Sequence, residues 1–231
     1  MKLKVSFILI CLVLCCHTIA QNQRWIVQGN DDINSSIPDS VKYKYSSFTS
    51  GRVTFKDGTK GSSFLNYNLL LGEVQFVSLK GDTLSLANEN TIRSISINQD
   101  TFYYDNVYLQ FIAGNTSAKL AKSEKMRLAD IKKRGGFENY TSSGGIENYS
   151  SLNIGARTLH LTENKQLIFI THIFYYIGDP YYHFLPATKR NVLKMFSKRK
   201  GLAAYLNENK IDFSKEEDLK KLLAYLNTIS Q

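Results

Sequence analysis

The chain has 231 residues, of which 43% are hydrophobic, 12% aromatic and 21% charged. This composition supports one folded unit and excludes a disordered, collagen-like or coiled-coil chain. Lys and Arg outnumber Asp and Glu by 29 to 20, which gives a formal net charge of +9, and that excess bears on partners rather than on the fold.

Residues 1–20 have the layout of a secretory signal peptide. Lys2 and Lys4 are followed by an apolar run that ends at Cys16, and Ala20 is a small residue suited to the position before a cleaved bond. A helix over this run would rise about 18 Å, which is short of the roughly 30 Å hydrocarbon core of a bilayer. We therefore expect cleavage near residue 20, an exported protein, and no transmembrane segment in the mature chain.

Cysteine use limits how the mature chain is stabilised. All three cysteines of the chain (Cys11, Cys15 and Cys16) lie in the leader. Without them an exported protein has no disulfides and depends on a hydrophobic core. Their absence also excludes thiol catalysis, zinc–thiolate sites and iron–sulfur clusters after cleavage.

The first half of the mature chain predicts an arm followed by a sheet. Residues 21–48 have no hydrophobic period and predict a flexible N-terminal arm, in which residues 25–27 form at most a short edge strand. Over residues 51–113, short runs of β-branched and aromatic residues alternate with compact turns such as Asp57 and Gly58. These closely spaced turns leave no room for crossover helices, so the segment predicts an antiparallel β-meander.

The middle of the chain is less regular. Residues 118–134 are rich in Lys and Arg and predict a short basic helix or an extended linker, and residues 135–156 are rich in Gly and Ser and predict a mobile loop. Residues 157–177 predict a β-hairpin. Its second strand, residues 167–177, is apolar on both faces, which indicates an interior position in the sheet.

The last part of the chain, residues 187–230, predicts amphipathic helices. Thr188 is placed to cap the first helix, and Ser214 and Glu217 form the pattern of a capping box before the last one. An apolar stripe at helical spacing follows at Leu219, Leu222, Leu223, Leu226 and Ile229. The predicted fold is thus a single α+β domain over residues 49–231, an antiparallel meander followed by C-terminal helices.

Four short segments carry a resemblance to a known family. They are residues 61–68 (GSSFLNYN), 81–84 (GDTL), 190–196 (RNVLKMF) and 210–219 (KIDFSKEEDL). Together they resemble a family of uncharacterised exported proteins from Bacteroidetes bacteria, from about residue 50 to the end. The resemblance implies export across the inner membrane of a Gram-negative cell, and it implies no activity or catalytic residue.

A search for catalytic chemistry finds no metalloprotease, serine-hydrolase, P-loop or dinucleotide-binding motif. The mature histidines, His160, His172 and His183, match no short-range ligand spacing, so we predict no metal and no cofactor. Paired carboxylates for glycoside hydrolysis leave no sequence pattern, and the acids of the mature chain lie mostly in turns or in the last helix. The sequence therefore assigns no catalytic residue.

Positive charge gathers in two segments. Residues 119–134 hold 7 basic and 2 acidic residues, and residues 187–231 hold 10 and 5, an excess of five in each. The densest run, here called the basic segment, is a candidate binding site for anionic envelope surfaces; its residues are Lys189, Arg190, Lys194, Lys198, Arg199 and Lys200. The alternative is that these cations are the solvated face of a helix. Export argues against nucleic acid as a partner.

Tyrosine is also abundant, with one group at Tyr103, Tyr104 and Tyr108 and another at Tyr175, Tyr176, Tyr181 and Tyr182. Exposed tyrosines would stack on sugars or anchor a protein partner, whereas buried ones are ordinary strand formers. The sequence thus predicts an exported, non-enzymatic binding or envelope-interaction protein in the periplasm or at the cell surface. Its partner would be an anionic envelope surface or another envelope protein. The alternative is a hydrolase that acts on an envelope polymer through carboxylates that the sequence does not locate.

Overall fold

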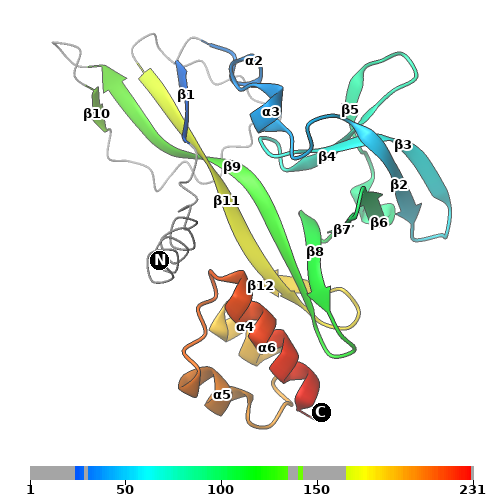
Figure 1. Cartoon of the computed structure of the whole chain (residues 1–231), viewed down its shortest axis with the longest axis vertical. Helices are drawn as coiled ribbons and strands as arrows, with labels where there is room; N and C mark the ends of the chain where they lie inside the picture. Colours follow the sequence, from blue (N-terminus) through cyan, green and yellow to red (C-terminus); the bar gives the residue numbers. More distant parts are fainter. Residues whose placement is uncertain (1–23, 29–30, 135–139, 143–164, 230–231) are drawn as a thin grey trace, which may run out of the picture.

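One antiparallel sheet of twelve strands runs through the residues that the computed structural model describes, which are 24–28, 31–134, 140–142 and 165–229 (Figure 1). The helices are short, and three of them close the chain. The fold is therefore α+β, as predicted, although it is mostly sheet.

Every strand of the predicted meander region forms. The strands are β2 (Thr49–Phe55), β3 (Lys60–Asn68), β4 (Glu73–Val77), β5 (Thr83–Ser85), β6 (Ile92–Ile97), β7 (Asp100–Tyr104) and β8 (Tyr108–Gly114). The turn between β2 and β3 shows why the signals are strong: Gly58 takes a φ of 91°, and Asp57 Oδ1 accepts hydrogen bonds from the Thr59 N–H and hydroxyl at 2.8 and 2.7 Å.

The strand order departs from a simple meander at one point. Strands β2 to β5 pair in sequence, but β6 then returns to pair with β2 on its other side, so β5 and β6 are not neighbours. A 3-10 turn, η1 (Glu89–Thr91), leads into β6, and the Lys56 N–H donates to the Thr91 carbonyl at 2.8 Å. Val53 faces Ile95 across this pairing and both are buried, so the return extends one buried surface.

A long two-stranded ribbon forms the spine of the molecule. Strand β9 (Lys119–Arg134) pairs with β8 on one side and with β11 (Lys165–Gly178) on the other. The prediction of a basic helix or linker at residues 118–134 is therefore wrong. Leu120 and Met126 are buried at an even spacing, as on one face of a strand, while the cations between residues 119 and 132 are half-exposed.

Strand β11 has two partners on its outer side. β1 (Arg24–Gln28) pairs with it as far as Ile170, and β12 (Phe184–Pro186) pairs with it from Tyr176. Leu167, Phe169 and Ile177 are buried as predicted, but His172 and Ile173 are exposed between the two partners. The hairpin partner predicted at residues 157–161 lies outside the described residues.

The predicted N-terminal arm is instead packed. β1 lies at the edge of the sheet, and two short helices follow, α2 (Ile33–Ser36) and α3 (Asp39–Lys42). Ile33 and Ile37 are buried. Each helix is a single turn, too short to give a readable hydrophobic period, so the prediction of a flexible arm at residues 21–48 is wrong for the described part of that range. The loop predicted at residues 135–156 lies outside the described residues except for β10 (Tyr140–Ser142), which pairs with β9.

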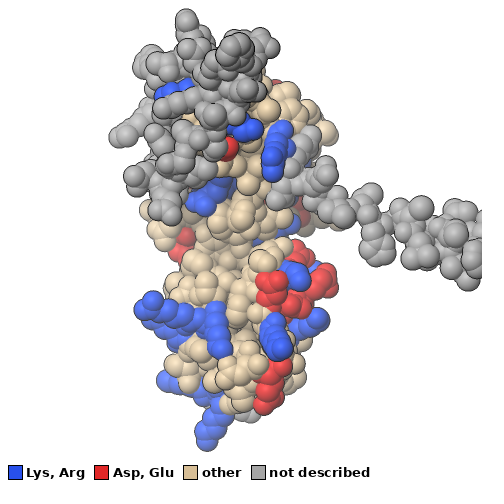
Figure 2. Space-filling model, turned by 90° about the vertical axis from the view of Figure 1, so that its left-hand side faces the viewer, with Lys and Arg blue, Asp and Glu red and all other residues tan. Residues whose placement is uncertain are grey.

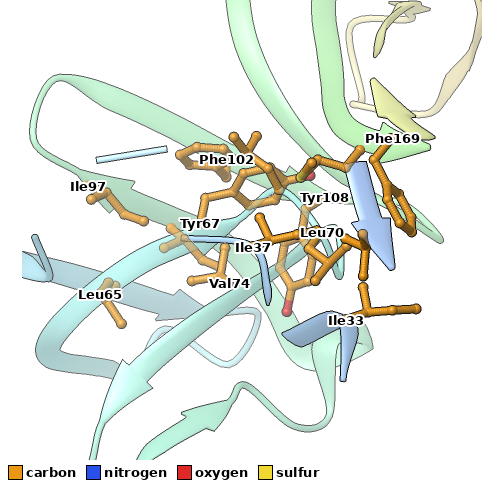
Figure 3. Close-up of a cluster of buried hydrophobic side chains, with 14 of the residues drawn as sticks. Ile33, Ile37, Leu65, Tyr67, Leu70, Val74, Ile97, Phe102, Tyr108 and Phe169 are labelled. Carbon is orange, nitrogen blue, oxygen red and sulfur yellow. The ribbon is translucent and has the colours of Figure 1, made fainter. Parts of the chain in front are cut away.

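Buried side chains form two large clusters at opposite ends of the ribbon. The first lies among β2 to β9, β11 and the N-terminal elements, and Tyr67 and Phe102 stack at its centre with ring centroids 5.3 Å apart (Figure 3). The second joins Leu120 and Ile177 to the C-terminal helices. A small third cluster holds Phe184 and one face of Tyr103, and it supports the candidate site described below.

The C-terminal helices are α4 (Lys189–Met195), α5 (Leu202–Glu208) and α6 (Glu216–Thr228). The predicted leucine stripe of α6 is buried, and Thr188 caps α4 by accepting the Asn191 N–H at 3.2 Å. The capping box at Ser214 is wrong, because α6 begins after Lys215 and the Ser214 hydroxyl donates to Asp212 at 2.6 Å. None of the helices in the described ranges has the length and apolarity needed to cross a bilayer.

Candidate functional site

The basic segment does not form one continuous cationic surface. The Arg199 guanidinium donates from Nη1 to the carbonyl oxygens of Leu226, at 3.1 Å, and Ile229, so it caps the C-terminal end of α6. Lys189 donates to Asn207. The remaining four, Arg190, Lys194, Lys198 and Lys200, are exposed. Figure 2 shows both basic and acidic side chains on the lower part of the molecule, where these helices lie.

A pocket of about 610 Å³ lies elsewhere, where two tyrosine groups far apart in the sequence come together. It is bounded by the turn after β2, the start of β6, the end of β7 and the loop between β11 and β12. Its lining residues are Lys56, Ile92, Arg93, Ser94, Tyr103, Tyr104, Asp105, Pro180, Tyr181, Tyr182 and His183. Pockets of this size commonly hold a small ligand.

Strand alternation places one tyrosine at the pocket. On β7, Phe102 points into the first cluster and is 1% exposed, so Tyr103 projects from the opposite face of the sheet. There its ring meets Phe111 edge-on, with centroids 6.0 Å apart, and lies near Phe184. Burial, and then a hydrogen bond with Tyr182, raise the pKa of Tyr103, so the phenol stays neutral at physiological pH.

The loop of residues 179–183, here called the aromatic loop, is organised by one carboxylate. Asp179 Oδ1 accepts the backbone N–H groups of Tyr181 and His183 at 2.8 and 3.0 Å, and Oδ2 lies 2.9 Å from His183 Nδ1. The Asp179 N–H also donates to the His183 carbonyl at 3.1 Å, which closes the loop. These contacts hold Tyr182 at a φ of 67°, a left-handed conformation that is uncommon for a bulky residue.

The two tyrosines of this loop differ in how they are held. The ring centroids of Tyr182 and Tyr103 lie 4.6 Å apart, and Lys119 Nζ lies 5.4 Å from the centroid of the Tyr182 ring. Tyr182 is 41% exposed, whereas Tyr181 is 80% exposed. The pocket therefore presents the Tyr182 ring packed against Tyr103 and the largely exposed Tyr181 side chain.

The aromatic loop is also fastened to the turn between β7 and β8. Asp105 Oδ2 accepts the Phe184 N–H at 2.8 Å, and the Phe184 ring packs tightly over Gly178, where an added Cβ would lie 2.6 Å from it. Glycine is thus required at position 178 for close approach. These contacts fix the two walls of the pocket against each other.

Charge is distributed unevenly around the pocket. The Arg93 guanidinium contacts the backbone of Lys56, because Nη2 donates to the Lys56 carbonyl oxygen at 3.1 Å. Asp105 and His183 come from the β7–β8 turn and the aromatic loop. The hydrogen bond and the charge of Asp179, with a smaller effect of Asp105, raise the pKa of His183 above its usual value. Burial alone would raise the pKa of Asp179, but hydrogen bonds from His183 and Tyr181 lower it.

The histidines do not form a metal centre within the described ranges, where no three His, Cys, Asp or Glu side chains gather closely enough to hold an ion. His172 lies on β11 beside Phe174, and burial, then the charge of Arg127, lower its pKa. His183 lies in the aromatic loop, and His160 is outside the described residues.

Sequence reasoning named the tyrosines but did not bring the two groups together, and it missed Lys56 and Arg93. The turn at Asp57 and Gly58 predicts that Lys56 lies at the end of a strand, but no local pattern in the sequence indicates a role for Arg93. Comparisons with protein-family models, with curated proteins and with solved structures each find no match to this chain. The site must therefore be interpreted from its own geometry.

Proposed function

We propose that this is an exported binding protein whose tyrosine-lined pocket takes a saccharide. The observation that carries the proposal is the meeting of Tyr103, Tyr181 and Tyr182 at one pocket of about 610 Å³. A sugar ring offers flat C–H surfaces that pack on aromatic faces and hydroxyls that bond to phenol, carboxylate and imidazole groups. Tyrosine supplies both an apolar face and a polar tip.

The rigidity of the aromatic loop supports binding as the task of the pocket. Asp179 makes three side-chain hydrogen bonds within the loop, and Asp105 fastens the loop's end. A surface that is ordered before the ligand arrives loses less conformational entropy on binding. The left-handed backbone of Tyr182 is strained, and strained residues of this kind are concentrated at functional sites.

The predicted leader supports an extracytoplasmic setting, where glycans of the envelope and its surroundings are abundant. Cleavage after residue 20 would leave the pocket intact, because all its lining residues lie between Lys56 and His183. The protein is accordingly proposed to act in the periplasm or at the cell surface.

The alternative of a hydrolase has weaker support in the same geometry. Glycoside hydrolysis uses two carboxylates on either side of the scissile bond. Among the described residues that line the pocket there is one carboxylate, Asp105, and its Oδ2 already accepts the Phe184 N–H. Asp179 does not line the pocket, and its carboxylate accepts the N–H groups of Tyr181 and His183 and pairs with the His183 ring.

The test is a glycan array that spans neutral, uronate, sulfated and phosphorylated oligosaccharides, probed with the protein as it is secreted from cells that express the full chain. We expect retention on a subset of glycans, loss of that retention in the Tyr181→Ala/Tyr182→Asn variant, and no loss in the Lys198→Gln control. Chromatography of the retained glycans should show them uncleaved. Retention equal to that of the tyrosine variant on every glycan would refute the proposal, and cleavage would favour the hydrolase.

A further inference from the structure

We infer that the pocket selects acidic saccharides, with the negatively charged group of the ligand against Lys56 and Arg93. This inference rests on the proposed function and adds the chemical class of the ligand. It is carried by the position and exposure of these two cations, by their lack of an ion-pair partner among the described residues, and by the negative charge of Asp105 at the other part of the pocket.

A β-bulge in the pairing of β2 with β6 directs Arg93 toward the backbone of Lys56. In the pairing of β2 with β6, Thr54 faces Ser94 and Phe55 faces Ile92, so Arg93 is an extra residue without a partner. A bulge of this kind redirects a side chain out of the regular alternation. The guanidinium then reaches back across the strand pair to the Lys56 carbonyl, 3.1 Å from Nη2.

Neither cation is neutralised in the part of the chain that the structure describes. Both are exposed and both line the pocket, and neither forms an ion pair with a carboxylate of the described residues. The contact to the Lys56 carbonyl uses one N–H of Arg93, which leaves others of its fork to donate. The Arg93 guanidinium and the Lys56 ammonium belong to residues that line the same pocket, and both groups donate well to a carboxylate, sulfate or phosphate oxygen.

The other part of the pocket repels an anion and suits hydroxyls. Asp105 is a carboxylate whose charge contributes to the raised pKa of His183, so the two side chains lie close enough to interact. A second negative charge from a ligand is unfavourable beside Asp105, whereas sugar hydroxyls can donate to it and accept from the imidazole. The pocket therefore orients a ligand with its acid group toward Lys56 and Arg93 and its ring over the tyrosines.

The negative group has two chemical sources, a uronate carboxylate in the sugar itself or a sulfate or phosphate ester on a hydroxyl. The shared chemistry is an anionic oxygen cluster on a saccharide. A planar carboxylate accepts from the Arg93 fork in a bidentate manner, and an ester group offers three acceptor oxygens. The experiment below separates these sources by including both.

The experiment compares acidic oligosaccharides with neutral counterparts of the same backbone by isothermal titration calorimetry. The probes are oligogalacturonate and its carboxyl-reduced form, and a sulfated oligosaccharide and its desulfated form, in low and high salt. The variant is Lys56→Gln/Arg93→Gln. The control is Lys60→Gln, which removes an exposed lysine on the same hairpin that does not line the pocket.

We expect at least one acidic probe to bind 10-fold or more tightly than its neutral counterpart, and salt to weaken the acidic probe alone. The double variant should reduce the preference to less than 2-fold, and Lys60→Gln should preserve it. Equal affinity for the acidic and neutral members of both pairs overturns the inference, as does a preference that survives in the double variant. If neutral sugars still bind and Tyr181→Ala/Tyr182→Asn abolishes that binding, only the inference has failed; if no probe binds in a tyrosine-dependent way, the proposed function has failed with it.

Discussion

The basic segment and the tyrosine-lined pocket are two opposite ways of placing charged and aromatic groups on a surface. The basic segment is continuous in sequence, yet its six cations separate in the structure: Arg199 caps α6, Lys189 binds Asn207, and the others face solvent. The pocket brings together Lys56 from the β2–β3 turn, Arg93 from β6, Tyr103 from β7 and Tyr182 from the aromatic loop. A run of cations that is dense in the sequence can therefore separate in the fold, whereas side chains far apart in the sequence can line one pocket.

The difference also predicts two kinds of binding. Four exposed cations attract an anionic surface without fixed geometry, and that attraction falls steeply with salt. The pocket combines fixed rings with a few oriented polar groups, so its binding should depend on the shape of the ligand. The following experiments separate the two regions.

The largest expected effect is on vesicle binding. Changing Arg190, Lys194, Lys198 and Lys200 to Gln should weaken retention on anionic lipid vesicles at low salt by about 100-fold or more, since each cation near such a surface contributes about 1 kcal/mol. Arg199 is left intact because its loss would disturb α6. Sedimentation with vesicles measures the effect, glycan binding serves as the control and should not change, and unaltered retention would show that the basic segment is only a solvated face.

The next effect is on the pocket. Tyr182→Asn should weaken glycan binding by about 30-fold, equivalent to about 2 kcal/mol, because a fixed aromatic anchor is lost. Asparagine tolerates the left-handed backbone at this position, so the loop should keep its conformation. Calorimetry measures the affinity and circular dichroism checks the fold. A change of less than 3-fold would mean that Tyr182 is not an anchor.

Arg199 should matter for stability, unlike its neighbour. Arg199→Ala should lower the free energy of unfolding by about 2 kcal/mol, because the α6 carbonyls at Leu226 and Ile229 lose a charged donor. Lys198→Ala should change it by no more than about 0.5 kcal/mol. Urea denaturation measures both, and equal values for the two variants would contradict the division of the basic segment.

A smaller difference should separate the two predicted helix caps. Thr188→Ala should cost about 1 kcal/mol, because the Thr188 hydroxyl oxygen accepts the Asn191 N–H at the start of α4. Ser214→Ala should cost less, since Ser214 lies outside α6 and its N–H and hydroxyl donate to the Asp212 carboxylate rather than capping the helix. If urea denaturation gave the larger loss for Ser214→Ala, the capping box predicted from sequence would be restored.

The smallest effect concerns pH. The pKa of His183 in the folded protein is raised above the value of about 6.5 expected when unfolded. The stabilisation of the aromatic loop by this pair is therefore complete below pH 6.5 and is lost as pH rises through the folded pKa. Nuclear magnetic resonance should show a His183 pKa above 6.5 that returns toward 6.5 in Asp179→Asn, and an unchanged pKa in that variant would contradict the pairing.

Local signals predicted much of the fold. The seven strands of the meander region follow from alternating apolar residues and turn residues such as Asp57 and Gly58, and the α6 stripe follows from its 3.6-residue period. Strand β9 was missed because its many cations obscured an even spacing that Leu120, Met126 and Leu128 do show.

Local signals did not predict which strands pair or where the pocket forms. Nothing local indicates that β6 returns to β2 or that β1 adds to β11, because those choices depend on which apolar faces meet. The pocket follows from these pairings and from the closure of the aromatic loop by Asp179. Its tyrosines were visible in the sequence, but their meeting is a tertiary property.

The most direct measurement of the central claim is a nuclear magnetic resonance titration of the isotope-labelled protein with the oligosaccharide that binds most tightly on the array. The account predicts that the largest shifts occur at Tyr181, Tyr182 and Tyr103 and at the side chains of Lys56 and Arg93, while signals of α4 stay in place. Shifts centred on α4, or spread without focus over the surface, would contradict it.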